Sequence, residues 1–304
     1  MLKKSVVSGA TLIVPDIEDS VPVAEKPKAR HLVNQYLPFI RENAIEASSV
    51  IITPRTNQPS LPSLWDADIQ ALFYEPESCP QVFDGLCVPK IDQVEDIKKV
   101  HDVLEEVERK GGVEGKRFKI IAQIESAASM VNMKDIFSYD LARSQKLGMP
   151  QGRIIGAAFG ADDFTADLGV HRSDNDRSEL DFARRLFALT CAAYPGIVSI
   201  DTPYVQFRDP EGLREELRYL KTIGMKAKLA IHPTQVPVIN SEMIMSQEDL
   251  DYYEEMIRQF ERAQVEDKKA AIVYKEKMVD IAAYRRALEL VKRRHSLSKF
   301  VGGE

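Results

Sequence analysis

The chain has 304 residues, of which 44% are hydrophobic and 29% charged, and this is the composition of a soluble globular protein with a large core. Its net charge of -6 argues against nucleic acid as the main partner. No run of 18 apolar residues occurs, so no membrane-spanning helix is expected. The three cysteines have no C-x-x-C spacing, and no targeting signal is visible, so we expect a reducing compartment, the cytoplasm or the mitochondrial matrix.

Short apolar runs, each ending on or near an ionisable side chain, are the most informative feature of the sequence. Such runs are typical of strands that are buried on both faces of a parallel sheet. In a barrel of parallel strands the carboxyl ends meet at one face, which carries the chemistry. We therefore interpret the chain as an enzyme. The seven runs are Thr11–Asp19, Val50–Arg55, Gly85–Lys90, Lys119–Glu125, Ile154–Asp163, Ile197–Asp201 and Lys228–His232.

Amphipathic helical patterns alternate with most of these runs, which predicts an α/β fold. The sequence has no G-x-G-x-x-G and no G-x-x-x-x-G-K-[ST], so a barrel is favoured over a doubly wound sheet. We predict a TIM (β/α)8 barrel over residues 1–240 that lacks its first strand, followed by a C-terminal helical segment, 241–304. The proline-rich stretch Gln58–Pro80 is expected to be a long loop over the catalytic face. The clearest helical patterns are Asp92–Lys110, Glu179–Tyr194, a helix capped by Asp209 with Pro210 at its first position, a long helix from Ser246, and a last one from about Val279 to Lys292.

Two acidic residues at strand ends are the main candidates for chemistry. Glu125 ends one run, and Asp163 follows the next run by two residues. Two carboxylates that converge at a barrel face are typical of a site for a hard cation such as Mg²⁺. The alternative is that both carboxylates accept hydrogen bonds from loop amides or helix N-termini.

Arg55 ends the second strand-like run, where a guanidinium can grip a carboxylate or a developing enolate. The alternative is a structural ion pair with Glu18 or Asp19. Asp16, Glu18 and Asp19 alternate along the first run, so we expect that they do not all face the same way and that at least one orients Arg55 or Lys90.

Three other reactive side chains fit chemistry less well. Lys90 is a poor Schiff-base lysine, because acidic neighbours raise the pKa of an amine that this chemistry needs lowered. His232 has no second histidine at ligand spacing, and the simpler interpretation is a core histidine bonded to a carbonyl. Cys87 lies inside an apolar run, where a thiolate is disfavoured.

Nine motifs in a fixed order give the chain a family resemblance. It resembles the citrate lyase beta-subunit-like proteins of the 2-oxo acid aldolase superfamily, which include malyl-CoA and citramalyl-CoA lyases, over about Leu2 to Leu290. The motifs are D-I-E-D-S-V (Asp16–Val21), P-R-T-N (Pro54–Asn57), V-P-K (Val88–Lys90), Q-I-E-S (Gln123–Ser126), G-A-D-D-F-T-A-D-L-G (Gly160–Gly169), S-E-L-D-F-A-R (Ser178–Arg184), I-D-T-P-Y (Ile200–Tyr204), I-H-P-T-Q (Ile231–Gln235) and K-M-V-D (Lys277–Asp280).

The resemblance implies a TIM barrel, a magnesium ion and a CoA thioester substrate. Glu125 and Asp163 match the family's two metal carboxylates, and Arg55 matches its substrate-binding arginine. Lys90, Ala161 and Asp162 also fall at substrate-binding positions, with Asp162 as the acidic neighbour that is not a metal ligand.

The resemblance also implies an oligomer, a homotrimer or larger. Asp280 matches an aspartate that members supply from the C-terminal segment to a neighbouring subunit's site, where it acts as acid or base. Family members usually have glycine where Glu276 stands, which bears on the turn before Asp280, and Ala227 is a milder change of the same kind. Members also begin with a strand of the form hydrophobic-x-hydrophobic-V-P-G that this sequence does not contain.

The expected activity is Mg²⁺-dependent cleavage, or formation, of a short 3-hydroxyacyl-CoA such as citramalyl-CoA or malyl-CoA. The products of cleavage would be acetyl-CoA and a 2-oxo acid, pyruvate or glyoxylate. One alternative is an aldolase that acts on free 2-oxo acids without CoA. Another is a catalytically silent interaction subunit of the same fold, in which the first and last strands are edges that a partner covers.

Overall fold

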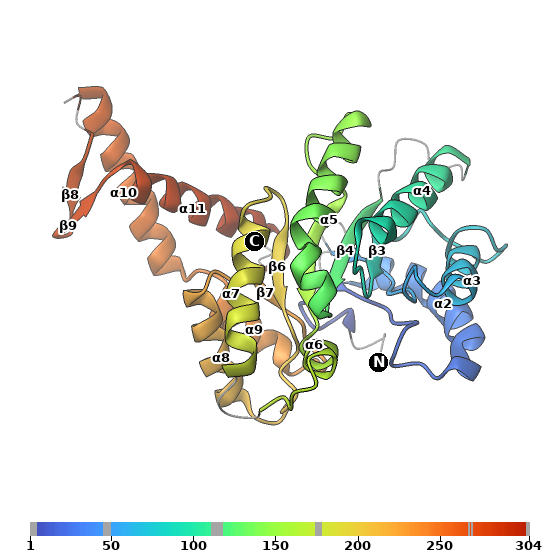
Figure 1. Ribbon diagram of the computed structural model, residues 1–304. Coiled ribbons are helices and arrows are strands. Elements are labelled where there is room, and N and C mark those ends of the chain that lie inside the picture. Colours follow the sequence, from blue (N-terminus) through green and yellow to red (C-terminus); the bar gives the residue numbers. More distant parts are fainter. Residues whose placement is uncertain are drawn as a thin grey trace. The chain divides into compact units, whose positions relative to one another are not determined.

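The computed structural model describes residues 5–44, 50–110, 118–173, 178–266, 268 and 270–301. The chain divides into two compact units, Met1–Ile239 and Asn240–Glu304. Figure 1 shows the strands and helices of the first unit in blue to yellow and those of the second in orange to red.

Parallel strands in chain order form the framework of the first unit. β1 pairs with β2, and β3 to β7 pair in sequence. Parallel bridges from Arg55 to Asp16 and to Cys87 join the two groups. A strand lies in each of the seven predicted runs, although the last one shares only Lys228 with the predicted run Lys228–His232. Their bounds are β1 Leu12–Ile13, β2 Ile51–Ile52, β3 Gly85–Val88, β4 Lys119–Ile124, β5 Ile154–Phe159, β6 Val198–Asp201 and β7 Ala227–Lys228.

The sheet curves around a common apolar core. Cys87, Ile121, Ala158 and Ile200, one from each of β3 to β6, form a buried cluster. Leu12 and Val14 from the first strand pack against it, as do Ala227 and Leu229 from the last. The two ends of the sheet therefore share one core, as in a barrel. Within the described ranges no hydrogen bond pairs β7 with β1, and no eighth parallel strand occurs, so the fold is α/β and TIM-barrel-like.

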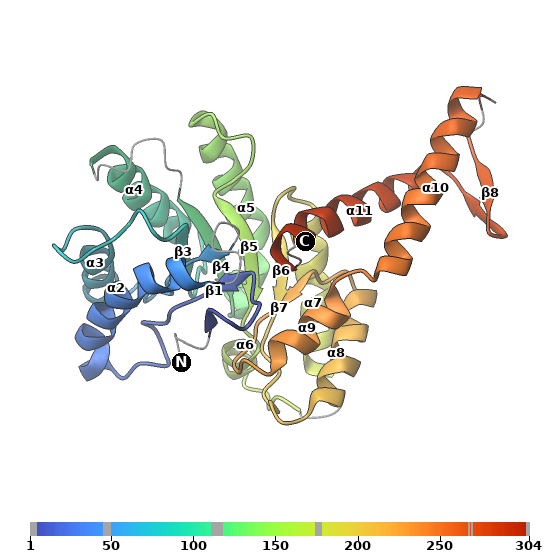
Figure 2. The ribbon, with the colours of Figure 1, turned by 180° about the vertical axis from the view of Figure 1, so that it is seen from behind.

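Helices follow most strands and cover the outer side of the sheet (Figures 1 and 2). The predicted helices after the third, fifth and sixth strands are confirmed as α4, α7 and α8, and the side chain of Asp209 caps α8 as expected. The first unit's helices are η1 Val23–Glu25, α2 Lys26–Asn43, α3 Pro62–Phe73, α4 Val94–Lys110, α5 Ala127–Lys146, α6 Ala161–Asp167, α7 Ser178–Ala192, α8 Pro210–Thr222 and α9 Gln235–Met243, which ends in the second unit.

The predicted loop over Gln58–Pro80 is wrong, because most of this stretch is helix α3. Its prolines flank the helix instead of interrupting it, and Pro62 occupies the first turn, where no amide donor is needed. Trp65, Ile69 and Leu72 recur at helical spacing and are buried. Helices α2 and α5 were not predicted.

A buried network of four charges ties the last strands to their helices. Arg184 of α7 donates to Asp201 from Nε at 2.9 Å and to Glu216 of α8 from Nη2 at 2.5 Å. Lys228 Nζ donates to Asp201 Oδ2 at 2.7 Å. Two positive and two negative charges offset one another inside the fold, where any one alone would be costly. Asp201 therefore has a structural role, although it ends a strand as a catalytic residue would.

The second unit is a helical hairpin with a small sheet. α10 (Gln247–Glu266) packs against α11 (Ile281–Val301), and β8 (Ile272–Tyr274) pairs antiparallel with β9 (Lys277–Val279). Phe260, Tyr274, Val279 and Ala287 are among the residues of its core.

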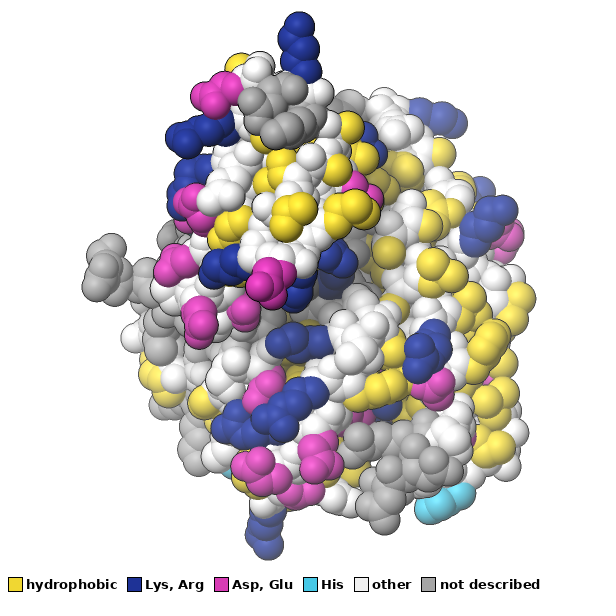
Figure 3. Space-filling model, turned by 90° about the vertical axis from the view of Figure 1, so that its left-hand side faces the viewer, with side chains coloured by type: hydrophobic (Ala, Val, Ile, Leu, Met, Phe, Trp, Pro, Cys, Tyr) yellow, Lys and Arg dark blue, Asp and Glu magenta, His cyan; other side chains and the backbone are white. Residues whose placement is uncertain are grey.

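No described helix is long and apolar enough to cross a membrane. On the face of the molecule in Figure 3, acidic and basic side chains are intermixed, with hydrophobic side chains between them.

The turn between β8 and β9 carries backbone strain at the position where the resemblance implies glycine. Lys275 and Glu276 have φ angles of 45° and 64°, in the left-handed region. Two central residues with positive φ define the type I′ turn of a tight hairpin, which favours glycine or asparagine. The turn before Asp280 therefore forms with glutamate present, at a cost that glycine would not incur.

We predict that Glu276→Gly stabilises this hairpin. A left-handed L-residue costs roughly 1–2 kcal/mol, and the extra chain entropy of glycine offsets about half of the gain, which leaves ~0.5–1 kcal/mol. Amide hydrogen exchange in β8 and β9 should slow by about two- to fivefold. Lys277→Gly, in the adjacent strand, is the matched control and should speed the exchange. Faster exchange in Glu276→Gly would contradict the strain assigned to this residue.

Candidate active site

Glu125 follows β4 directly, and a helix cap fixes the backbone around it. Ser126 caps α5, with its hydroxyl accepting from the amide of Ser129 at 2.9 Å. The Ser129 hydroxyl lies 3.1 Å from the backbone nitrogen of Glu125 and accepts its hydrogen bond. The sequence Glu-Ser at the end of a strand thus holds the carboxylate at the carboxyl end of the sheet.

The Glu125 side chain is 3% exposed and has defined neighbours on both sides. The Lys90 amide, at the end of β3, donates to Glu125 Oε1 at 2.9 Å. The other oxygen, Oε2, lies over Gly160, where a Cβ would come within 2.5 Å of it. Only glycine therefore leaves room for the carboxylate at this point of the β5–α6 junction.

Asp163 lies in the first turn of α6, three residues after Gly160. Its charge raises the pKa of Glu125, which places the two predicted carboxylates in one electrostatic environment. Within the described part of the chain Asp163 has no hydrogen-bond or ion-pair partner, and no group of three or more His, Cys, Asp or Glu side chains could hold a metal ion. The site thus offers two carboxylates, as Mg²⁺ sites with bound water and substrate commonly do.

The electrostatics of this pair favour a cation. Burial raises the pKa of Glu125 to about 8, the negative charges of Asp163 and Glu18 add to the shift, and Lys90 opposes it. Burial and neighbouring negative charge favour the protonated form of a carboxyl group. A cation that binds beside the group favours its ionised form instead.

Arg55 is held by two acidic residues from the end of β1. Its Nε and Nη2 donate to the two carboxylate oxygens of Asp16, at 2.6 and 2.5 Å. Its Nη1 lies 3.1 Å from Glu18 Oε2. Burial alone would lower the pKa of Arg55, but the contacts with Asp16 and Glu18 raise it, so the guanidinium stays charged. Arg55 therefore does form the ion pair with Glu18 that was the alternative interpretation, but its main partner is Asp16.

The ammonium group of Lys90 pairs with the same acidic segment. Nζ lies 3.0 Å from Glu18 Oε1 and 2.7 Å from Asp19 Oδ2. Burial favours a lower pKa for Lys90, but these carboxylates outweigh it and raise the pKa. A charged amine cannot attack a carbonyl, so the rejection of a Schiff-base role holds.

The expectation that at least one of Asp16, Glu18 and Asp19 orients Arg55 or Lys90 is confirmed, but the expectation that they do not all face the same way is wrong. All three contact Arg55 or Lys90. The alternation rule applies within a strand, and β1 ends at Ile13. Beyond Asp16 the chain bends, and Val21 N donates to Glu18 O at 2.9 Å. This turn brings both of the last two acidic side chains to Lys90.

The other two predicted substrate-binding positions lie at the start of α6. Ala161 is buried, and its amide donates to the Thr202 hydroxyl at 3.3 Å. Asp162 is exposed and pairs with Arg172, with Nη1 2.7 Å from Oδ1. The side chain of Asp162 is therefore engaged by Arg172.

Two further candidates from the sequence, His232 and Cys87, have other roles in the structure. His232 is not a core histidine: it is exposed, stacks on Phe207 with 5.1 Å between ring centroids, and bonds the Thr234 hydroxyl at 2.8 Å. Burial raises the pKa of Cys87, which keeps it a thiol inside the apolar core.

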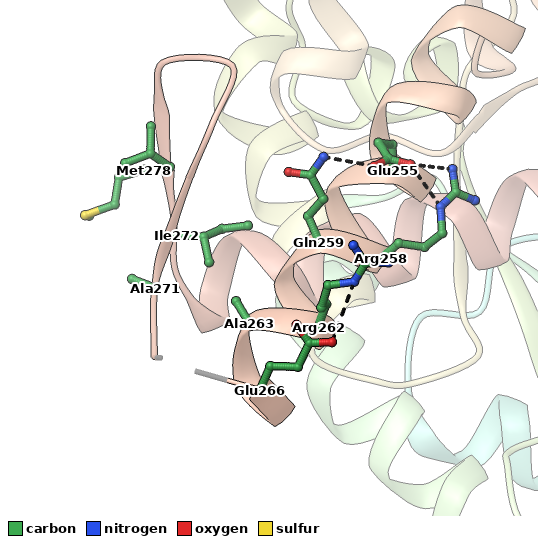
Figure 4. Close-up of a pocket in the computed structure, with 10 residues that line it drawn as sticks. Glu255, Arg258, Gln259, Arg262, Ala263, Glu266, Ala271, Ile272 and Met278 are labelled. Atoms are coloured by element: carbon green, nitrogen blue, oxygen red, sulfur yellow. Dashed lines mark hydrogen bonds and ion pairs between the residues drawn. The ribbon is translucent and has the colours of Figure 1, made fainter. Parts of the chain in front are cut away.

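Two pockets of the described structure are lined by residues other than Glu125 and Asp163. One of about 770 Å³ belongs to the second unit, between α10 and the β8–β9 hairpin (Figure 4). Ion pairs along α10, such as that of Arg258 with Glu255 at 2.8 Å, line its helical side. One of about 360 Å³ is lined by Phe207 and His232 in the first unit.

Asp280 belongs to the second unit and caps α11 there. Its Oδ1 accepts from the amide of Ala283 at 2.9 Å. The side chain is half-buried.

Sequence reasoning missed Gly160 and the bridging position of Glu18. Glu18 is 3% exposed and joins Lys90 to Arg55. A glycine between a buried strand and an acidic pair is a usable signal, because glycine at a strand end often marks close approach of another group. For Glu18 the D-I-E-D segment was noted, but its turn gave no local signal.

The amino-acid sequence of the chain is similar to those of known proteins. Residues 1–233 match the HpcH/HpaI aldolase/citrate lyase family. The chain belongs to this family. It is 27% identical to citrate lyase subunit beta of Leuconostoc mesenteroides subsp. cremoris, over 96% of this chain and 88% of that protein. It is 28% identical to an L-malyl-CoA/beta-methylmalyl-CoA lyase of Cereibacter sphaeroides, over 98% and 92%.

Solved structures of the family share the fold. The structure of protein CitE from Mycobacterium tuberculosis in complex with magnesium, acetoacetate and coenzyme A has a TM-score of 0.68 to this chain. The two are 22% identical, with 95% of this chain and 91% of that chain covered. The family resemblance and the α/β fold predicted from the sequence are confirmed, and the chain is an enzyme of a lyase family.

We predict that Mg²⁺ binding releases a proton at neutral pH. A carboxyl group with a pKa of about 8 is about nine-tenths protonated at pH 7 and must ionise to bind a metal. Titration calorimetry in two buffers of different ionisation enthalpy should show close to one proton released at pH 7 and almost none at pH 9.5.

The raised pKa of Glu125 also determines the direction in which the free energy of unfolding changes with pH. Ionising Glu125 is unfavourable in the fold, so the unfolding free energy of the metal-free protein should fall as pH rises from about 4.5 to 8. Mg²⁺ should reduce this fall. In the two-buffer titration, a Mg²⁺-binding heat at pH 7 that is the same in both buffers would contradict the raised pKa assigned to Glu125.

Proposed function

We propose that the protein is a Mg²⁺-dependent carbon–carbon lyase that cleaves, or in reverse forms, a short 3-hydroxyacyl-CoA such as citramalyl-CoA or malyl-CoA. The products of cleavage are acetyl-CoA and a 2-oxo acid, pyruvate or glyoxylate. The observation that carries the proposal is the buried Glu125 carboxylate, tied at Oε1, with Oε2 over Gly160 and the charge of Asp163 nearby.

The donor set supports Mg²⁺ as the cation. Both candidate ligands, Glu125 and Asp163, are carboxylates, and no described cluster adds histidine or cysteine. Oxygen donors with room left for water and substrate suit Mg²⁺ better than zinc or copper. When bound, Mg²⁺ stabilises negative charge on the oxygens of the 2-oxo acid and of the alkoxide that precedes it.

The names of the relatives and the charges of the site support a CoA thioester as the substrate. The Cereibacter sphaeroides relative, 28% identical over 98% of this chain, is named for malyl-CoA and beta-methylmalyl-CoA. The substrate and the 2-oxo acid product are anionic, and Arg55 and Lys90 lie beside the carboxylates as cations. The Arg55 guanidinium can hold a carboxylate next to a metal despite the net charge of -6, and the charge of Lys90 adds to the local positive field.

Arg55 is positioned to stabilise charge that develops during cleavage. Cleavage transfers the hydroxyl proton to solvent water, breaks the bond between the carbinol carbon and the thioester α-carbon so that the carbinol becomes the carbonyl of the 2-oxo acid, and leaves the electron pair on the thioester as an enolate that then takes up one proton. Asp16 fixes the guanidinium in a bidentate pair, so its orientation costs little at the moment of reaction. We propose that Arg55 stabilises these anionic groups.

Asp280 is proposed as the acid that protonates the enolate carbon to give acetyl-CoA, and as the base in the reverse direction. It begins α11 in the second unit, after the strained hairpin. We propose that residues 241–304 supply it to a neighbouring subunit of a homotrimer or larger homo-oligomer.

We predict that Glu125→Gln lowers Mg²⁺-dependent acetyl-CoA release by about 10²-fold or more. The amide is the same size as the carboxylate but is a much weaker ligand. Asp135→Asn, an exposed carboxylate on α5, is the matched control and should retain the wild-type rate. The measurement is acetyl-CoA release from malyl, citramalyl and methylmalyl thioesters, with and without Mg²⁺. Wild-type turnover by Glu125→Gln would refute the proposed role of this residue.

A CoA-independent aldolase is the alternative outcome of the same panel. Acetyl-CoA should raise the melting temperature of the wild-type protein if CoA thioesters are its ligands. No stabilisation by acetyl-CoA, together with cleavage of free 3-hydroxy acids, would favour the aldolase.

Mixing two inactive variants tests the subunit that supplies Asp280. We predict that Glu125→Gln and Asp280→Asn, each low in activity alone, recover about a quarter of the wild-type activity when co-assembled at equal amounts. That fraction of sites combines an intact Glu125 from one chain with an intact Asp280 from another. No recovery in mixed oligomers would show that each site takes both residues from one chain.

A further inference from the structure

Lys90 is strained in a way that its predicted substrate-binding role does not explain. Its φ is 50°, and apart from glycine it is the one described residue of the first unit with a left-handed backbone. A lysine there costs roughly 1–2 kcal/mol relative to ordinary backbone. Strain of this kind persists only when surrounding contacts impose it.

The strained backbone directs the Lys90 amide to Glu125. Its N–H donates to Glu125 Oε1 at 2.9 Å. With one oxygen held in this way, the other is left over Gly160, on the side of α6 and Asp163. The rotamer of the proposed metal ligand therefore depends on the conformation of residue 90.

The ion pairs of the Lys90 side chain hold the backbone in this conformation. Its ammonium group is anchored by Glu18 at 3.0 Å and Asp19 at 2.7 Å, on a turn from another strand. Both ends of the residue are thus fixed, the ammonium by two carboxylates and the amide by a third.

We propose that Lys90 is a positioning residue for the metal site and not a ligand of the substrate. It acts through its main-chain amide on Glu125, and its side chain serves to keep that amide in place. The inference rests on the proposed Mg²⁺ site and adds to it a residue that touches neither the metal nor the substrate.

A pair of variants separates the backbone from the charge. Lys90→Gly and Lys90→Ala both remove the ammonium group, so the change in local charge is the same. Glycine occupies the left-handed region without strain, whereas alanine without the anchor is free to leave it and must be drawn back when the metal binds. We expect Lys90→Gly to bind Mg²⁺ about tenfold more tightly than Lys90→Ala, measured by calorimetry on the metal-free full chain.

A third variant guards against a folding defect. Lys90→Asn tolerates the left-handed region and should resemble Lys90→Gly if Lys90→Ala proves unstable by thermal denaturation. KM for the thioester is measured on the same variants. A positioning role predicts that KM at saturating Mg²⁺ changes little in Lys90→Gly, because the amide that holds Glu125 is kept.

The outcomes distinguish this inference from the function on which it rests. If the wild-type protein fails to bind Mg²⁺, the metal site itself is wrong. If the wild type binds Mg²⁺ and the glycine and alanine variants bind it equally, the positioning role is refuted and the metal site stands. If both variants bind Mg²⁺ like wild type but KM rises equally in both, Lys90 is a substrate ligand and the inference fails.

Discussion

Glu125 is buried beside other negative groups, and this constrains everything around it. A carboxylate in such a place is unfavourable unless positive charge or hydrogen bonds offset the loss of water. The protein supplies one backbone hydrogen bond from Lys90 and the nearby ammonium of the same residue, yet the pKa of Glu125 stays raised to about 8. The remaining imbalance is what a divalent cation beside Asp163 would neutralise, which supports the proposed metal site.

The acidic turn after β1 organises the positive side of the same site. Asp16 grips Arg55, Asp19 grips Lys90, and the buried Glu18 contacts both cations. These pairs keep both cations at the carboxyl ends of neighbouring strands. The arrangement also explains how a site made largely of carboxylates can accept an anionic substrate, since the two cations lie within it.

Much of the fold could be predicted, because buried parallel strands have a local signature: all seven apolar runs form strands. Glu125 and Asp163 were identifiable as residues that follow such strands. The helix Pro62–Phe73 is not evident from the sequence, because prolines near both of its ends give this stretch the composition of a loop. The close approach of Glu125 to Gly160 and the anchoring of Lys90 by Glu18 join residues far apart in sequence, and no local pattern encodes them.

The most direct test is a crystal structure of the protein with Mn²⁺ in place of Mg²⁺, because the anomalous signal locates the ion without ambiguity. The account predicts a single ion that bridges Glu125 Oε2 and the Asp163 carboxylate, at coordination distances close to the roughly 2.0–2.1 Å of Mg²⁺, with Glu125 Oε1 still bonded to the Lys90 amide. An ion bound elsewhere, or Glu125 and Asp163 in direct contact with protein donors and no ion between them, would contradict it.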